Sequence, residues 1–188
     1  MNQKSIELVL TDCELVTSAN KHLYLSPLQN QHILITGGTG FLGTWITELV
    51  SFLNKKYGFK IKLTLLARDT KSFVSKAPHL AKESFINLVS KDVRAIVDLP
   101  EDVNYIIHAA SNPDSREHNL NPLLVIDSIT NGTANVFEKS TRLNNLNKII
   151  NLSSGLVYGT QPKEVKSLPE NYFGNLDCAQ VTSIYSEA

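Results

Sequence analysis

Three glycines at a fixed spacing indicate where this chain could bind phosphate. Gly37, Gly40 and Gly43 lie in the stretch QHILITGGTGFLG, which covers residues 31–43. Gly37 could adopt a positive φ in a tight turn, Gly40 has no Cβ to block a diphosphate, and Gly43 would let a following helix pack close to the preceding strand. The amides and the positive dipole end of that helix would face the phosphates. Because the spacing is G-x-x-G-x-x-G rather than the commoner G-x-G-x-x-G, a plain strand-to-helix turn remains the alternative.

Hydroxyl side chains form the second group that could do chemistry. Ser153, Ser154 and Tyr158 lie in SSGLVYG, directly after the apolar run KIINL, and Tyr185 lies in TSIYSEA at residues 182–188. Hydroxyls at the carboxyl end of a central strand would point toward the crevice where a cofactor lies. A Ser-Ser turn without a chemical role is the alternative.

Alternating strand and helix patterns supply the elements that would position these groups. We expect strands at 33–36, 61–67, 85–89, 105–110 and 148–152, and helices at 41–55, 70–85 and 123–143. This order predicts an α/β fold, a doubly wound parallel sheet of the Rossmann type with helices on both faces and right-handed crossovers. Residues 31–188 would form this NAD(P)-binding domain, and residues 1–30 an N-terminal extension with a short helix.

Composition and charge exclude several classes of protein. The 188 residues suggest one domain, and 18 basic against 18 acidic residues give a net charge of zero, which argues against nucleic-acid and membrane-surface binding. No apolar run approaches the ~20 residues that span a bilayer, and acidic residues interrupt the N-terminal apolar stretch, unlike a secretion signal. Cys13 and Cys178 are too few for a metal site or a disulfide framework. We therefore expect a cytoplasmic protein without a metal.

Two further segments bear on the cofactor. Arg68 takes the position after the second strand where an acidic residue binds the ribose of NAD, which favours NADP over NAD, unless Arg68 is simply a solvated surface residue. Asp69 follows it. Small residues at the end of the fourth strand, Ala109, Ala110 and Ser111, would leave room for a ligand, whereas the buried position of His108 predicts a structural histidine.

The motifs TGGTGFLG, SSGLVYG and TSIYSEA resemble those of the extended short-chain dehydrogenase/reductase superfamily, the NAD(P)-dependent nucleotide-sugar epimerases and dehydratases. The resemblance covers residues 31–188. It implies that Ser154 is the catalytic hydroxyl and Tyr185 the catalytic tyrosine. It also implies that the remaining candidate residues bind the dinucleotide: Gly37, Gly40, Phe41, Leu42, Gly43, Arg68, Asp92, Val93, Ala109, Ala110 and Ser111, with Asp92 and Val93 flanking the adenine.

In such enzymes hydride transfer to nicotinamide accompanies proton movement at the attached sugar oxygen. A tyrosine, with an ordinary pKa near 10, needs a nearby cation to act as a base. The motif lysine of this family would fall just past Ala188. The resemblance thus implies an N-terminal fragment that ends before the C-terminal substrate domain, binds dinucleotide and has little or no activity.

Departures from the family pattern narrow the reaction. Gly155 and Leu156 occupy the positions where 4,6-dehydratases and sugar-acid decarboxylases carry acidic residues, which favours an epimerase or a keto-sugar reductase. The usual asparagine before Gly132 is replaced by Ile129, with Asn131 beside the glycine instead. An NADP-dependent carbonyl reductase and a non-catalytic dinucleotide-binding protein remain alternatives. Related enzymes suggest a homodimer through residues 123–143 and the helix that begins near Tyr185.

Overall fold

The computed structural model describes residues 3–18, 21–111, 114–174, 176–177 and 183–188; the expected loop at Asn112–Pro113 and the second cysteine, Cys178, lie outside the described residues. The strands in this part of the chain are β1 (His32–Thr36), β2 (Lys62–Ala67), β3 (Ile86–Ser90), β4 (Tyr105–His108) and β5 (Lys148–Asn151). The α-helices are α1 (Gln3–Thr17), α2 (Phe41–Tyr57), α3 (Lys71–Lys76), α4 (Pro78–Ala81), α5 (Ser115–Leu120), α6 (Pro122–Ser140) and α7 (Ile184–Glu187). Short 3-10 helices are η1 (Lys21–Leu28), η2 (Val93–Ala95) and η3 (Gly155–Tyr158).

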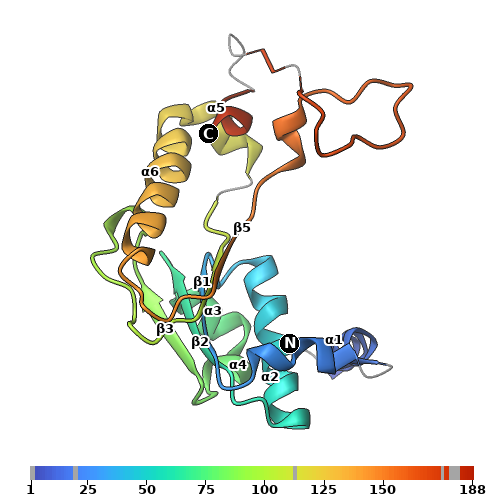
Figure 1. Cartoon of the computed structure of the whole chain (residues 1–188), viewed down its shortest axis with the longest axis vertical. Coiled ribbons are helices and arrows are strands. Elements are labelled where there is room, and N and C mark those ends of the chain that lie inside the picture. The colour runs from blue at the N-terminus through green and yellow to red at the C-terminus, as the bar shows by residue number, and fades with distance from the viewer. Residues whose placement is uncertain (1–2, 19–20, 112–113, 175, 178–182) are drawn as a thin grey trace.

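The described strands form one parallel sheet in the order β3-β2-β1-β4-β5 (Figure 1). The chain first builds outward from β1 through β2 to β3, and then crosses to the other side of β1 to form β4. The strand order therefore reverses between β1 and β4, which is where open α/β sheets bind ligands, at the carboxyl ends of the strands. This architecture confirms the expected Rossmann-type α/β fold.

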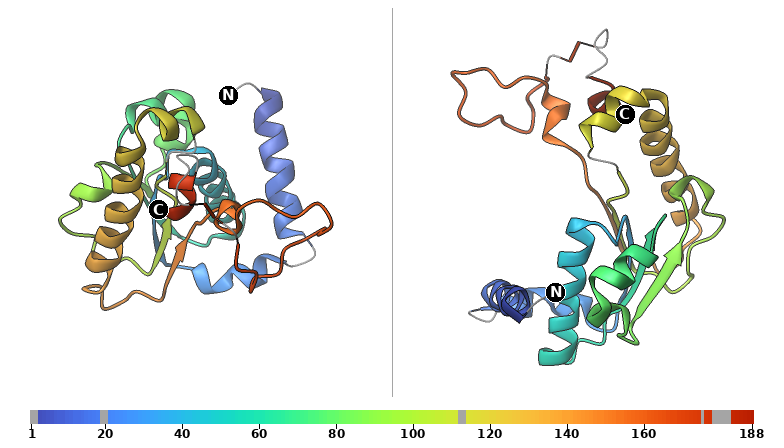
Figure 2. Two further views of the ribbon diagram at one scale, coloured as in Figure 1. Left: turned by 90° about the horizontal axis from the view of Figure 1, so that it is seen from above. Right: turned by 180° about the vertical axis from the view of Figure 1, so that it is seen from behind.

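Helices cover both faces of the sheet because side chains alternate along each strand. On β1, Ile33 and Ile35 face a core formed with α2, α3 and α4, while Leu34 faces a second core formed with α6 and η2. The first core also contains Val50, Leu53, Phe59, Ile61, Leu63, Leu65, Phe73, Ala77 and Leu80, and the second contains Leu66, Val93, Ile96, Leu99, Val103, Ile106 and Val136. Figure 2 shows these two layers on opposite sides of the strands.

Some elements differ from the sequence-based expectation. The helix expected over 70–85 is two short helices, α3 and α4, separated at Ala77 just before Pro78. The strand expected over 105–110 ends at His108, and its residues alternate between half-buried and buried. Helix α2 stops as expected at Gly58, which adopts φ 66° and donates its N–H to Asn54 O.

The N-terminal segment packs against the outside of α2. Cys13 and Thr17 of α1 are buried, and Lys56 of α2 pairs with Glu14 at 3.1 Å. Figure 2 shows α1 lying beside the sheet domain. No α-helix of the described residues is both long and apolar enough to cross a membrane.

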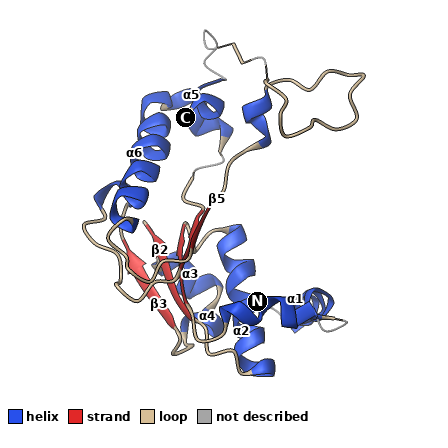
Figure 3. Ribbon diagram, viewed as in Figure 1, coloured by secondary structure: helices blue, strands red, loops and turns tan. Residues whose placement is uncertain are grey.

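Beyond β5 the chain leaves the sheet. Figure 3 shows mostly loop in this part, with η3 and α7 beyond the carboxyl end of β5. Helix α7 contacts both α6 and η3. The segments that carry Ser154 and Tyr185 are thereby brought together at the carboxyl edge of the sheet.

Candidate active site

The glycine turn is held between β2 and the end of β4. Gly37 adopts φ 67°, and its N–H donates to Leu66 O at 2.8 Å. A Cβ at Gly37 would lie 2.5 Å from Ala109 O, so only glycine fits this close approach. The turn is thus fixed by its backbone contacts at the switch point of the sheet.

Gly43 contacts a different part of the chain from the one expected from the sequence. A Cβ there would overlap the backbone of Gly38, so Gly43 permits close contact between α2 and the turn itself. Gly38, which sequence reasoning did not single out, is equally constrained: its Cβ would lie 2.8 Å from Ile35 O and 3.0 Å from the Leu65 side chain. The doubled glycine in TGGTG was the available signal.

The amino end of α2 is open to a ligand. Its N-cap residue is Gly40, and no side chain of the described residues caps it. The first N–H groups of a helix have no intrahelical acceptor, and the dipole makes this end positive. The turn therefore offers what a diphosphate requires, and the sequence-based placement of Gly40, Phe41 and Leu42 around it fits this geometry.

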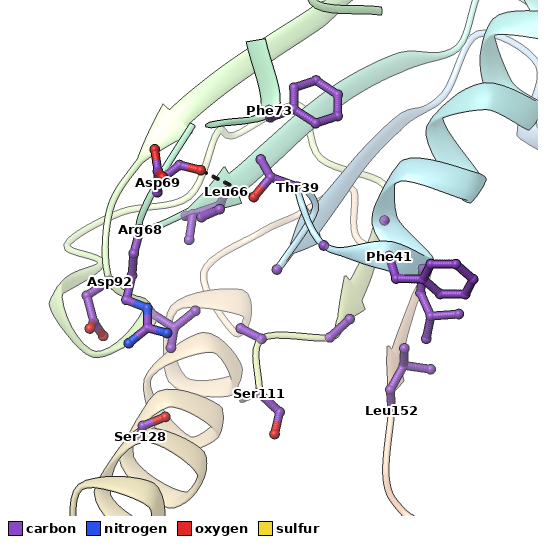
Figure 4. Close-up of a pocket in the computed structure, with 18 of the residues that line it drawn as sticks. Thr39, Phe41, Leu66, Arg68, Asp69, Phe73, Asp92, Ser111, Ser128 and Leu152 are labelled. Atoms are coloured by element: carbon purple, nitrogen blue, oxygen red, sulfur yellow. Dashed lines mark hydrogen bonds between the residues drawn. The ribbon is translucent and has the colours of Figure 1, made fainter. Parts of the chain in front are cut away.

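A cavity of about 560 Å³ opens directly in front of the turn. Its lining includes all eleven residues that the sequence and the resemblance suggested for dinucleotide binding: Gly37, Gly40, Phe41, Leu42, Gly43, Arg68, Asp92, Val93, Ala109, Ala110 and Ser111. Sequence reasoning missed other parts of this lining, including Thr39, Ser72, Phe73, Lys76, Lys91, Ser128 and Leu152, whereas it expected Ser153 near the cofactor. Figure 4 shows side chains from β2, from α6 and from Leu152, which directly follows β5, around this space. We call it the nucleotide cavity.

Arg68 and Asp69 differ in their availability at the end of β2. The Asp69 carboxylate accepts a hydrogen bond from Ser72 N at 3.1 Å and so caps α3. Arg68 forms no ion pair with another described residue. In Figure 4 the Arg68 side chain lies toward Asp92 and Ser128, while Asp69 lies on the side of Thr39. Both residues line the nucleotide cavity.

Asp92 lies on the opposite wall, at the start of η2. The Arg94 guanidinium donates to both carboxylate oxygens of Asp92 and holds the pKa of that carboxyl at about 2. Val93 is buried beneath the cavity and fits against Gly132 of α6, where a Cβ would lie 2.6 Å from Val93 Cγ2. The absence of a side chain at Gly132 thus lets α6 pack closely against η2.

His108 is a structural histidine, as its buried position predicted. Its Nδ1 bonds Thr36 Oγ1 at 2.6 Å, and its Nε2 bonds Thr133 Oγ1 at 3.1 Å. Burial lowers the pKa of His108, which favours the neutral imidazole. The ring therefore connects β1, β4 and α6, and His108 also lines the second cavity, which holds Ser154.

A second cavity of about 390 Å³ adjoins the first, and we call it the hydroxyl cavity. It contains both candidate catalytic residues, Ser154 and Tyr185. The two cavities share Ala109, Ala110, Ser111, Leu152, Ser153 and Tyr185. The Ser154 hydroxyl accepts from Leu156 N at 3.2 Å, and the Tyr185 ring stacks on His118 with centroids 4.4 Å apart. Tyr185 therefore borders both spaces.

The structure also shows where the residue that replaces the usual family asparagine lies. Ile129 lines the hydroxyl cavity, whereas Asn131 donates to Asp127 at 2.6 Å and lines neither cavity. Asn135, which the sequence analysis missed, donates to Val93 O at 2.7 Å and to Ile96 O at 3.0 Å and so ties α6 to η2. Among the described residues, no group of three or more His, Cys, Asp or Glu side chains could hold a metal ion.

Residues 33–187 match the sequence model of the NAD dependent epimerase/dehydratase family. The chain belongs to this family. The match covers the glycine turn, both cavities and all candidate residues, and it agrees with the resemblance carried by the three motifs.

Individual relatives are more distant. UDP-glucuronic acid decarboxylase 1 of Danio rerio is 25% identical over 164 residues, which cover 87% of this chain and 36% of that protein. Among solved structures, UDP-N-acetylglucosamine 4-epimerase of Methanobrevibacter ruminantium superposes with a TM-score of 0.65 at 20% identity, over 85% of this chain and 48% of the other. WbmF of Bordetella bronchiseptica, solved in complex with NAD+, gives a TM-score of 0.56 at 18% identity, over 86% and 44%. This chain thus spans between about a third and a half of the length of these proteins.

Proposed function

We propose that this chain carries the dinucleotide-binding and hydroxyl machinery of an NAD(P)-dependent enzyme that modifies nucleotide sugars. The observation that supports this proposal is the joining of the two cavities: Tyr185 borders both the space in front of the glycine turn and the space that holds Ser154. A dinucleotide in the first cavity and a sugar in the second would meet at these hydroxyls. Family membership and the UDP-sugar substrates for which the similar proteins are named support the same substrate class.

Each protein group has a distinct task in this proposal. The turn amides and the amino end of α2 bind the diphosphate, and the dinucleotide, when bound, supplies the hydride acceptor. Tyr185 accepts the proton from the sugar hydroxyl whose carbon is oxidised, and Ser154 orients that oxygen through a hydrogen bond. Ser153 and Leu152 form the wall between the two ligands.

An epimerase or a keto-sugar reductase fits these residues better than a dehydratase. Gly155 and Leu156 follow Ser154 in η3, and neither can donate a proton to a leaving hydroxyl. The test is to incubate the natural protein with NAD or NADP and a panel of UDP-, TDP- and GDP-sugars. Epimerised or reduced sugar supports the proposal, and formation of a dehydrated 4-keto-6-deoxy product would contradict it.

Replacing single tyrosines with phenylalanine tests the proposed catalytic role of Tyr185 against a control tyrosine. Tyr185→Phe should abolish turnover and leave dinucleotide binding intact, because it removes only the hydroxyl. Tyr158→Phe is the control, since Tyr158 lies in the motif that contains Ser154 but lines neither cavity. Equal turnover in the two variants would refute the role of Tyr185.

For the cofactor, we propose a preference for NADP over NAD. Arg68 lines the nucleotide cavity at the end of β2, in the position where the family places the group that meets the ribose, and a guanidinium there suits a 2′-phosphate. Fluorescence titrations should show tighter binding of NADPH than of NADH, and Arg68→Asp should remove this preference. An unchanged preference in Arg68→Asp would contradict the assignment. The control is Lys91→Met, which removes another cation from the same cavity.

The alternatives predict different results in the same assays. A carbonyl reductase of this fold would consume NADPH with a non-sugar ketone and ignore the sugar panel. A non-catalytic protein would bind dinucleotide without turnover of any substrate. A homodimer through α6 and the helix at Tyr185 remains part of the proposal, supported by the exposure of Leu123 at 80% and of Phe137 at 41% on α6.

A further inference from the structure

The phenol ring of Tyr185 lies face to face with a second ring that the proposed reaction does not use. The imidazole of His118 stacks on it with ring centroids 4.4 Å apart and an angle of 11° between the two planes. Both residues are half-buried. The described residues form no hydrogen bond with the Tyr185 hydroxyl, so the stack on His118 is the contact among them that orients this ring.

His118 reaches this place because α5 is held at both of its ends. Asp114 is the N-cap residue of α5, and its backbone oxygen accepts the His118 N–H at 3.2 Å. At the other end, Asn121 donates its N–H to Glu117 O at 2.8 Å and accepts the Val125 N–H at 3.1 Å. The short helix is thereby continued into α6, which also contacts α7.

The position of His118 excludes a direct part in the proposed chemistry. His118 lines neither the nucleotide cavity nor the hydroxyl cavity, whereas Tyr185 borders both. The N–H and the lone pair of an imidazole lie in the plane of its ring, and in a nearly parallel stack they point past the phenol rather than at its hydroxyl. Any effect of His118 on the reaction therefore passes through the orientation of the Tyr185 ring.

We infer that His118 is a positioning residue that holds the phenol of Tyr185 at the junction of the two cavities. The inference rests on the proposed function, since it concerns the tyrosine proposed as the base. A tyrosine side chain rotates about χ1 and χ2, and only some of its rotamers direct the hydroxyl to that junction. A flat ring against one face of the phenol favours the stacked orientation about three- to tenfold, the range for one aromatic pair. The hydroxyl is then held where it can accept the proton of the sugar.

A merely structural role for His118 makes a different prediction. The loop that leads into α5 begins at Ser111, which lines both cavities. A general loosening of α5 would therefore displace the walls of both cavities and weaken the binding of dinucleotide and sugar. The positioning role instead lowers kcat alone, because the cavities keep their shape and only the orientation of one hydroxyl changes.

The experiment measures kcat and KM for the sugar in the natural protein, and the Kd of NADPH by fluorescence titration. His118→Leu fills the space without a ring and should lower kcat about three- to tenfold, with KM and Kd at their wild-type values. His118→Phe restores a flat ring without nitrogen atoms and should recover most of the lost kcat. If His118→Leu does not fold, His118→Gln replaces it with the same expected result.

A second stack in the same chain provides a matched control. His22 lies on Tyr57 with ring centroids 4.3 Å apart and 11° between the planes, and neither residue lines a cavity. His22→Leu should therefore leave kcat, KM and Kd unchanged.

Three results would overturn the inference while the proposed function stands. These are a wild-type kcat in the ring-free variant that folds, a His118→Phe variant as slow as that ring-free variant, and a rise in KM or Kd that accompanies the loss of kcat. Failure of the wild-type protein to turn over any sugar of the panel refutes the proposed function, and the inference with it.

Discussion

Two glycines with nearly the same backbone conformation allow the glycine turn to be tested against an internal standard. Gly37 in the turn has φ 67°, and Gly58 at the end of α2 has φ 66°. Alanine at either position pays the cost of a left-handed conformation, about 1–2 kcal/mol. Only at Gly37 does the new Cβ also meet backbone, at 2.5 Å from Ala109 O, whereas nothing lies within 4 Å of a Cβ at Gly58.

The different surroundings of the two glycines set how much unfolding free energy each alanine substitution should cost. Forcing the Gly37 turn away from the end of β4 adds an overpacking cost of about 1–3 kcal/mol, because a backbone carbonyl cannot rotate aside like a side chain. We therefore expect Gly58→Ala to lose about 1–2 kcal/mol of unfolding free energy, and Gly37→Ala about 2–5 kcal/mol. Urea unfolding followed by circular dichroism measures both losses.

Dinucleotide binding provides the second measurement. Helix α2 has 17 residues, so Gly58 lies about 25 Å from the turn along the helix axis. Gly58→Ala should bind NADPH like the wild-type protein, and Gly37→Ala should bind it weakly even where it is fully folded. If Gly37→Ala were no less stable than Gly58→Ala and bound NADPH normally, the reasoning about the turn would be wrong.

Three further predictions follow from the structure. Burial lowers the pKa of His32, although the Asp102 carboxylate hydrogen-bonds to its ring. The unfolded chain therefore takes up a proton near pH 6.5 that the folded protein does not. Stability should fall as the pH drops below about 6.5, and His32→Gln should flatten this part of a urea-unfolding profile. Because the Arg94 bond holds the pKa of Asp92 at about 2, this carboxyl stays charged from pH 7 to pH 5, and the unfolding free energy lost in Asp92→Asn should be the same at both; a loss that changes in this range would contradict the assignment. Lys60 has φ 57°, so Lys60→Gly should raise the unfolding free energy by about 1 kcal/mol, and a lower midpoint in urea would count against this.

The parts of the fold that follow from local pattern were predictable from the sequence. The β-branched run before the glycines and the helical spacing after them fix β1 and α2, and repetition of this pattern implies a parallel sheet. The positive φ of Gly37 also follows from its place in the turn. The degree of burial along β4 was not predictable in this way. It depends on which helices cover the two faces of the strand, and no local sequence pattern encodes that.

Contacts between distant segments account for what sequence reasoning missed at the site. Gly43 was expected to face the preceding strand, but its neighbour is Gly38, five residues earlier, because the turn folds back under the helix. Arg94 and Asp127 are 33 residues apart, and their pairing depends on how α6 is rotated above η2. The one sequence signal for this part of α6 was that the asparagine usual in the family is absent before Gly132, while Asn131 stands beside that glycine.

The rotation of α6 is the single variable that connects the parts of the site. Within about two turns this helix presents Asp127 to Arg94, Ser128 to the nucleotide cavity, Ile129 to the hydroxyl cavity and Thr133 to His108. Neighbouring residues on a helix point about 100° apart, so a rotation by one position would break all four relations together. The close fit of Gly132 against Val93 fixes this rotation from the inside of the protein. Residues that line neither cavity are therefore as necessary to the proposed site as the hydroxyls themselves, because they determine which face of α6 the two ligands meet.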